Sequence, residues 1–138
     1  MNAMRTLSKL AVPLLLLPFA GCLSGGLGGG GGFGAASAGV TALDGGLIGQ
    51  NEATRAWPSQ ARSRALEAEF QALQFGLPGQ PVAWAADGFS GEVVPTQLYR
   101  VGSQDCRGYS HTFKGTAQPT KTVGTACKTA EGYWKPVA

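Results

Sequence analysis

Between residues 58 and 75, apolar positions recur with the period of a helix. They form a single stripe: Ala61, Ala65, Leu66, Phe70 and Leu73. Pro58 suits the first turn of such a helix, and Gly76 suits the position just past its end. We expect the charged side chains to form the solvated outer face: Arg62, Arg64, Glu67 and Glu69. The pattern therefore predicts one helix over 58–75, on which Glu67 and Glu69, two residues apart, do not face each other and form no catalytic pair.

After residue 79 the pattern changes to short runs that are typical of strands, separated by Gly, Pro, Asp and Ser. The expected strands are 82–86, 92–101, 106–114, 121–129 and 133–137. The short breaks between them favour an antiparallel meander with the helix on its apolar face. We predict an α+β fold, with one N-terminal helix on a small antiparallel β-sheet of four or five strands over 81–138. Four aromatic residues are expected to form much of its core: Trp84, Tyr99, Phe113 and Trp134.

The beginning of the chain has a different composition. Arg5 and Lys9 precede an apolar segment over 10–20, and the next charged residue is Asp44. Basic residues followed by a short apolar segment are typical of a secretory signal. The segment is shorter than the ~20 residues that a membrane-spanning helix needs. We therefore predict a signal peptide over 1–21.

Residues 19–22 (FAGC) resemble a bacterial lipobox, in which Leu, a small residue and Gly or Ala precede a cysteine. Phe19 stands here where the pattern has Leu. The resemblance implies cleavage before Cys22 and acylation of the sulfur and amino group of that residue. Acyl chains contribute ~0.8 kcal/mol per buried CH₂, which is sufficient for stable anchoring. The alternative is an unmodified cysteine in an ordinary signal peptide.

Glycine is concentrated after this cysteine. Residues 22–34 have the composition of a flexible tether that begins at the lipidated cysteine. Residues 35–50 carry small residues at four-residue spacing, which would let helices approach closely, and form a short segment similar to a glycine zipper. Its possible zipper contacts are Ala35, Gly39, Gly45 and Gly49. The segment is too short to span a bilayer, and a loosely ordered linker is the alternative.

The chain has 3 cysteines. If Cys22 carries the lipid, Cys106 and Cys127 remain, and in an oxidising compartment their default state is a disulfide. A metal site is the alternative, but two cysteines and the distant His111 supply too few ligands. We predict a disulfide between adjacent strands, no metal, and no cofactor besides the covalent lipid on Cys22.

Charge and candidate chemistry exclude several classes of function. A chain of 138 residues with a net charge of +3 is neither a large enzyme with a cofactor domain nor a strongly basic nucleic-acid binder. Six bases are scattered over the C-terminal part: Arg100, Arg107, Lys114, Lys121, Lys128 and Lys135. We interpret them as a solubilising surface, with a weak patch for anionic headgroups, lipopolysaccharide or an acidic partner as the alternative. His111 is expected to be a packing or surface histidine in a strand rather than a general base, and no catalytic constellation is recognisable, so we predict that the protein is not an enzyme.

Several stretches of the C-terminal part resemble the 17 kDa surface antigen family of bacterial outer-membrane lipoproteins. They are residues 79–84 (GQPVAW), 91–95 (GEVVP) with Tyr99, 106–109 (CRGY) and 124–134 (GTACKTAEGYW). Asp105 and Gly108 stand where the family has Tyr and Glu. The resemblance covers 62–138 and the lipobox. It implies a lipid-anchored antigenic envelope protein with a glycine-zipper segment and no known catalytic role.

We therefore expect a surface antigen domain over 51–138, held at the bacterial outer membrane on its periplasmic or outer side. The expected function is a structural or interaction role in the cell envelope. Expected partners are membrane lipid through the acyl chains and other envelope proteins, lipopolysaccharide or peptidoglycan, but not nucleic acid. The alternative function is inhibition of lysozyme or proteases, with contact through the loops 87–91 or 115–119.

Overall fold

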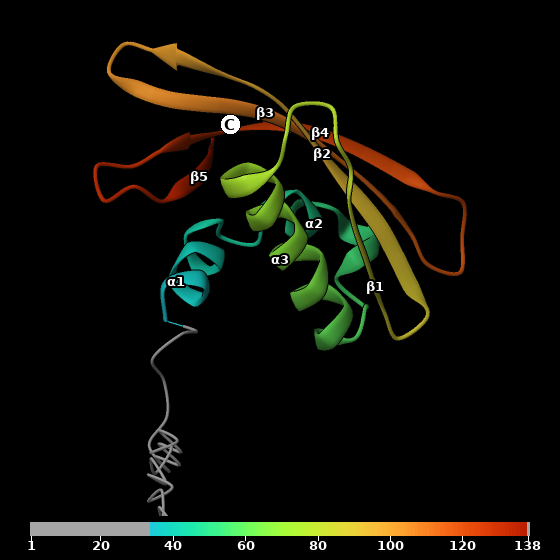
Figure 1. The fold of residues 1–138 in the computed structure, drawn as a ribbon. Coiled ribbons are helices and arrows are strands. Elements are labelled where there is room, and N and C mark those ends of the chain that lie inside the picture. The colour runs from blue at the N-terminus through green and yellow to red at the C-terminus, as the bar shows by residue number, and fades with distance from the viewer. Residues whose placement is uncertain (1–33, 138) are drawn as a thin grey trace, which may run out of the picture.

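The computed structural model describes residues 34–137, with side chains from residue 38 onward. Cys22, the signal peptide and the tether before residue 34 therefore lie outside the described residues. The elements in chain order are α1 (Gly34–Ala42), α2 (Gly46–Gln50), η1 (Glu52–Thr54), α3 (Ser59–Phe75), β1 (Val82–Ala86), β2 (Phe89–Val101), β3 (Gln104–Lys114), β4 (Thr120–Lys128) and β5 (Trp134–Val137) (Figure 1). Helices on one face of a single antiparallel sheet give the predicted α+β fold.

Helix α3 confirms the prediction from the apolar stripe. It is preceded by Pro58 as N-cap residue and followed by Gly76 as C-cap residue. Its buried face consists mainly of alanines, with Glu69 and Leu73 among them: Ala61, Ala65, Ala68 and Ala72. Alanine has little bulk, so the helix can lie close to the sheet.

The five strands form one sheet in the order β1-β2-β3-β4-β5, which is the predicted meander. Asp87 and Gly88 connect β1 to β2 with φ values of 53° and 81°. Positive φ at both central residues gives the type of tight turn that matches the twist of a two-stranded hairpin. The register of β2 against β3 shifts between Pro95 and Leu98, so β2 has an irregularity there.

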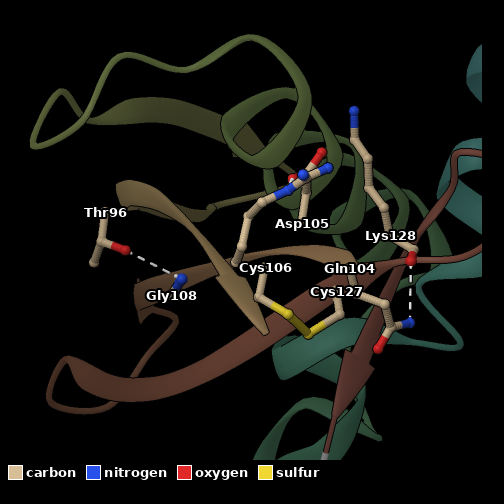
Figure 2. The surroundings of a disulfide bond; sticks show 8 residues. Thr96, Gln104, Asp105, Cys106, Gly108, Cys127 and Lys128 are labelled. Carbon is tan, nitrogen blue, oxygen red and sulfur yellow. Dashed lines mark hydrogen bonds and ion pairs between the residues drawn. A yellow bond between two sulfur atoms is a disulfide. The ribbon is translucent and has the colours of Figure 1, made fainter. Parts of the chain in front are cut away.

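Cys106 and Cys127 form the predicted disulfide (Figure 2). They are direct cross-strand partners in the pairing of β3 with β4, and their Cα atoms lie 4.0 Å apart. At the same end of the sheet, the Gln104 side-chain amide donates a hydrogen bond to the Lys128 carbonyl at 3.2 Å. The disulfide therefore fixes the end of the β3–β4 hairpin that is nearest to the β2–β3 turn.

The core contains three of the four predicted aromatic residues. Trp84, Phe113 and Trp134 are buried, but Tyr99 is 45% exposed, so its assignment to the core is wrong. Tyr99 pairs with Cys106 on β3. The next residue of β3 is Arg107, and the Arg107 side chain points to α3. Because neighbouring residues of a strand point to opposite faces, Tyr99 faces away from the helix.

The segment 38–50 packs onto α3 and the sheet. Leu43, Leu47 and Ile48 are buried in the same hydrophobic core as the sheet residues. Two glycines are needed for this approach, because a Cβ atom at Gly39 would collide with Phe70 and one at Gly46 would collide with Glu69.

The positions proposed as zipper contacts have different surroundings. Gly39 meets Phe70 of the same chain, Gly45 has a φ of 85°, and a Cβ at Gly49 would lie in open space. Ala35 lies in α1, but its side chain is outside the described residues. No helix in the described range 34–137 has the length and apolar character needed to cross a membrane. A contact of these glycines with another chain stays a prediction.

Candidate functional site

The most concentrated group of polar side chains lies between α3 and the sheet. It consists of Glu69 on α3, Trp84 on β1, and Tyr109 and His111 on β3, and we call it the Glu69 cluster. Glu69 and His111 are both 0% exposed. A buried carboxylate is rare unless other groups compensate its charge, so the hydrogen bonds of Glu69 decide what this cluster does.

The Glu69 carboxylate accepts three hydrogen bonds. The backbone amide of Leu47 donates to Oε2 and that of Ile48 donates to Oε1, both at 2.9 Å. His111 Nδ1 lies 2.7 Å from Oε1. Helix α2 thus begins directly on the carboxylate, where backbone N–H groups would otherwise lack a partner. Glu69 joins α2, α3 and β3.

The partners of His111 determine its protonation. The indole Nε1 of Trp84 lies 2.8 Å from His111 Nε2, and an indole nitrogen can only donate. His111 Nε2 must therefore accept, so the ring proton is on Nδ1 and is donated to Glu69. The pair consists of a neutral imidazole and a carboxylate whose charge is compensated by three donors.

The burial of Glu69 corrects our sequence interpretation, which placed it on the solvated face of the helix. The physical reason is that α2 covers this side of α3 and supplies two amide donors to the carboxylate. Glu67, two residues earlier, remains exposed and forms an ion pair with Arg64 at 3.2 Å. The sequence does contain a signal for the burial of Glu69. Ala61, Ala65 and Leu73 belong to one row of apolar residues spaced four apart, and Glu69 occupies the remaining position in that row.

Tyr109 places a phenol next to this carboxylate. Among the described residues, its hydroxyl is the one buried side-chain polar atom that has no hydrogen-bond partner. Burial, and then the negative charge of Glu69, raise the pKa of the Tyr109 phenol well above its usual range. The phenol is therefore protonated in the folded protein even where a free tyrosine, with a pKa of about 10, ionises.

We expect Tyr109→Phe to make the protein more resistant to alkali. In the unfolded chain Tyr109 ionises near pH 10, whereas in the folded chain it keeps its proton, so rising pH favours unfolding. This stability is fully present below pH 10 and decreases above it, by about 1.4 kcal/mol at pH 11. In the Tyr109→Phe variant, the free energy of unfolding should therefore decrease by that much less between pH 8 and pH 11. Urea unfolding of both proteins at pH 8 and pH 11 measures it, and equal decreases would contradict the assignment.

The chemistry open to the Glu69 cluster is limited by its enclosure. Glu69 and His111 have no exposed surface, so neither can touch a substrate in this conformation. Within residues 34–137, no group of three or more His, Cys, Asp or Glu side chains is placed to hold a metal ion. The arrangement orders α2 against the domain.

Arg107 is a second buried polar group, and it differs from the surface role that we expected for it. It is 4% exposed, and its guanidinium donates to carbonyl oxygens that belong mainly to the end of α3. Nη1 donates to Ala72 and Leu73 at 3.1 and 2.9 Å, Nη2 donates to Gly76, and Nε donates to Thr96 at 2.7 Å.

These bonds satisfy carbonyls that a helix leaves without partners in its last turn. Burial lowers the pKa of the Arg107 guanidinium. The alternation of buried residues in β3 could have revealed this position, because Tyr109, His111 and Phe113 share its face. Its charge hid it, because Arg107 was grouped with the scattered bases interpreted as a solubilising surface.

The two loops considered as inhibitor contacts lie at one end of the sheet. Phe89 follows the β1–β2 turn and stacks on Trp57 with ring centroids 4.4 Å apart. A Cβ atom at Gly115 would meet the Phe89 ring, so the β3–β4 loop contacts the same place. Phe89 and Gly115 thus pack together at the base of the loops, whereas Asp87, Gly88 and residues 116–119 are exposed.

Only some of the residues on which the expected function depends therefore lie within the described structure. The disulfide is in place, the zipper positions are partly described, and Cys22 lies before the first described residue. Comparison with protein-family models, with curated proteins and with solved structures finds no match to this chain in any of the three.

Proposed function

We propose that the protein is a lipid-anchored surface antigen of the bacterial outer membrane with a structural or interaction role in the cell envelope. The observation that carries this proposal is the position of Cys22. It directly follows a short apolar segment that begins after Arg5 and Lys9, and it is preceded by Ala20 and Gly21. The basic residues and apolar segment are typical of a secretory signal, and the residues before Cys22 resemble the lipobox at which exported bacterial proteins are acylated.

The folded domain supports the same proposal in two ways. Its disulfide engages Cys106 and Cys127, so Cys22 is the one cysteine of the chain left for acylation. Its most concentrated polar cluster is enclosed and positions α2, which suits a domain that acts through its surface. We therefore propose a non-enzymatic role.

The experiment is a deletion strain complemented with the wild-type chain or with Cys22→Ala. We expect deletion to increase sensitivity to detergent and chelator, and the wild-type chain to restore resistance. The Cys22→Ala variant should not restore it, because it cannot be acylated. Mass spectrometry of the N-terminal peptide measures acylation directly, with the wild-type peptide beginning at Cys22 and carrying acyl chains.

Two outcomes would contradict the proposal. A wild-type protein that carries no lipid on Cys22 would remove the anchor. An intact barrier in the deletion strain, together with increased sensitivity to lysozyme, would instead favour an inhibitor. Growth with and without lysozyme therefore belongs in the same experiment.

A further inference from the structure

Large apolar side chains are exposed mainly at one end of the molecule. Six of them lie where α3, the β2–β3 hairpin and the β4–β5 turn come together, and we call them the hairpin-end surface: Phe75, Leu77, Leu98, Tyr99, Val101 and Tyr133. Phe75 is 70% exposed and Val101 is 57% exposed. The β2–β3 hairpin projects beyond the helices at this end (Figure 1). Clustered apolar side chains of this size mark an interaction site.

Hydrogen bonds hold the parts of this surface together. Arg107 donates to the carbonyl of Gly76, the residue between Phe75 and Leu77, and its cross-strand partner is Leu98. The next segment of the loop is fixed to β2, because the Gly79 amide donates to the Pro95 carbonyl at 2.8 Å.

The arrangement of the hairpin distinguishes between possible occupants. Leu98 shares the face of Arg107, which points to α3, whereas Tyr99 and Val101 are on the opposite side. A protein partner with a flat surface would cover one side and leave the other exposed. A lipid layer closes around both sides of a projecting hairpin.

The charges at this end agree with a lipid surface. At the tips of the two hairpins that form it, residues 98–105 and 128–135 carry three cations against two acids: Arg100, Lys128 and Lys135 against Asp105 and Glu131, with Arg100 ion-paired to Asp105. Cations next to tyrosine and aliphatic side chains are typical of proteins that lie in the headgroup region of a bilayer.

The chain between Cys22 and α1 sets how far the domain can lie from its anchor. It has eleven residues, 23–33, and even a fully extended chain of this length spans only about 40 Å. A domain of about 100 residues has a radius of gyration of about 13 Å. The tether therefore holds the start of α1 within about 40 Å of the bilayer that carries the acyl chains.

We propose that the hairpin-end surface lies in the headgroup region of the membrane that carries the anchor. This inference rests on the proposed function for the presence of that membrane, and it adds a second contact made by the folded domain itself. The anchor keeps the domain near the bilayer, and the hairpin-end surface determines which end of the domain faces the bilayer.

The test uses the mature chain 22–138 with Cys22→Ser, so that no acyl chain contributes to binding. It is mixed with vesicles of phosphatidylethanolamine and a minority of phosphatidylglycerol, and the bound fraction is measured by co-sedimentation. We expect Val101→Asp to lower the partition coefficient about tenfold or more. The matched control is Val123→Asp, which places the same charge at a valine that is 71% exposed on β4. It should bind as the parent does.

Urea unfolding of each variant verifies that the domain is folded, and Leu98→Asp tests the other side of the hairpin independently. Absence of vesicle binding by the parent, or an equal loss in Val101→Asp and Val123→Asp, would overturn the proposal. A self-associating parent that becomes monomeric in Val101→Asp without binding vesicles would identify the surface as an interface between copies. Acylation of wild-type Cys22 is measured separately, so failure of the proposed function is recognised independently.

Discussion

Glu69→Ala is expected to lower the free energy of unfolding by about 4 kcal/mol. The substitution removes the acceptor of three buried donors, the amides of Leu47 and Ile48 and the imidazole Nδ1–H of His111. Each buried donor left without a partner costs about 1–3 kcal/mol. A domain of this size has a total stability of about 5–15 kcal/mol, so the loss is a large fraction of it. Urea unfolding followed by circular dichroism measures the change.

The matched control is Glu67→Ala, on the same helix. Glu67 is exposed and has one ion pair, with Arg64, so we expect a change within about 0.5 kcal/mol. Glu69→Gln keeps the volume and one acceptor oxygen, and it should lie between the two alanine variants. Equal stabilities of Glu69→Ala and Glu67→Ala would show that the carboxylate does not hold α2.

Arg107→Met should lower the free energy of unfolding by about 3 kcal/mol, nearly as much as Glu69→Ala. Methionine has a long unbranched side chain, but it leaves the carbonyls of Ala72, Leu73, Gly76 and Thr96 without their donor. Hydrogen bonds to a charged group contribute about 1.5–3 kcal/mol each, and water can replace some of them at the partly exposed Gly76. Thermal and urea unfolding measure the loss.

Arg100→Met is the control, because it makes the same change on the neighbouring strand. Arg100 is exposed, and its ion pair with Asp105 at 2.9 Å should contribute less than about 1 kcal/mol. Arg107→Lys keeps the charge but cannot reach all four carbonyls, so it should lose about half as much as Arg107→Met. If Arg107→Met and Arg100→Met were equally stable, the guanidinium would not be stabilising the end of α3.

The sheet and α3 could be predicted because their signals are local. Turn residues such as Asp87-Gly88 separate runs of apolar and β-branched residues, and the period of the alanines marks α3. Cys106 and Cys127 could be paired because assigning Cys22 to the lipid leaves only these two of the 3 cysteines.

The Glu69 cluster could not be predicted because its partners are distant in the chain. Glu69 meets the amides of Leu47 and Ile48 across 22 and 21 residues and His111 across 42 residues. A backbone amide carries no sequence signature, so the sequence alone does not show which side chain compensates a buried carboxylate. Tyr99 was misplaced for a related reason, since the register shift in β2 reverses which residues of that strand face the helix.

The alanine face of α3 has a further consequence for how the helix is placed on the sheet. A row of methyl groups is smooth, so apolar packing alone would let the helix slide or rotate with little change in buried area. Directional bonds oppose this at successive positions along α3: Glu69 to His111, Ala72 and Leu73 to Arg107, and Gln74 to Trp134 at 3.0 Å. The buried polar groups thus give the layers a single alignment, which the apolar contacts then stabilise.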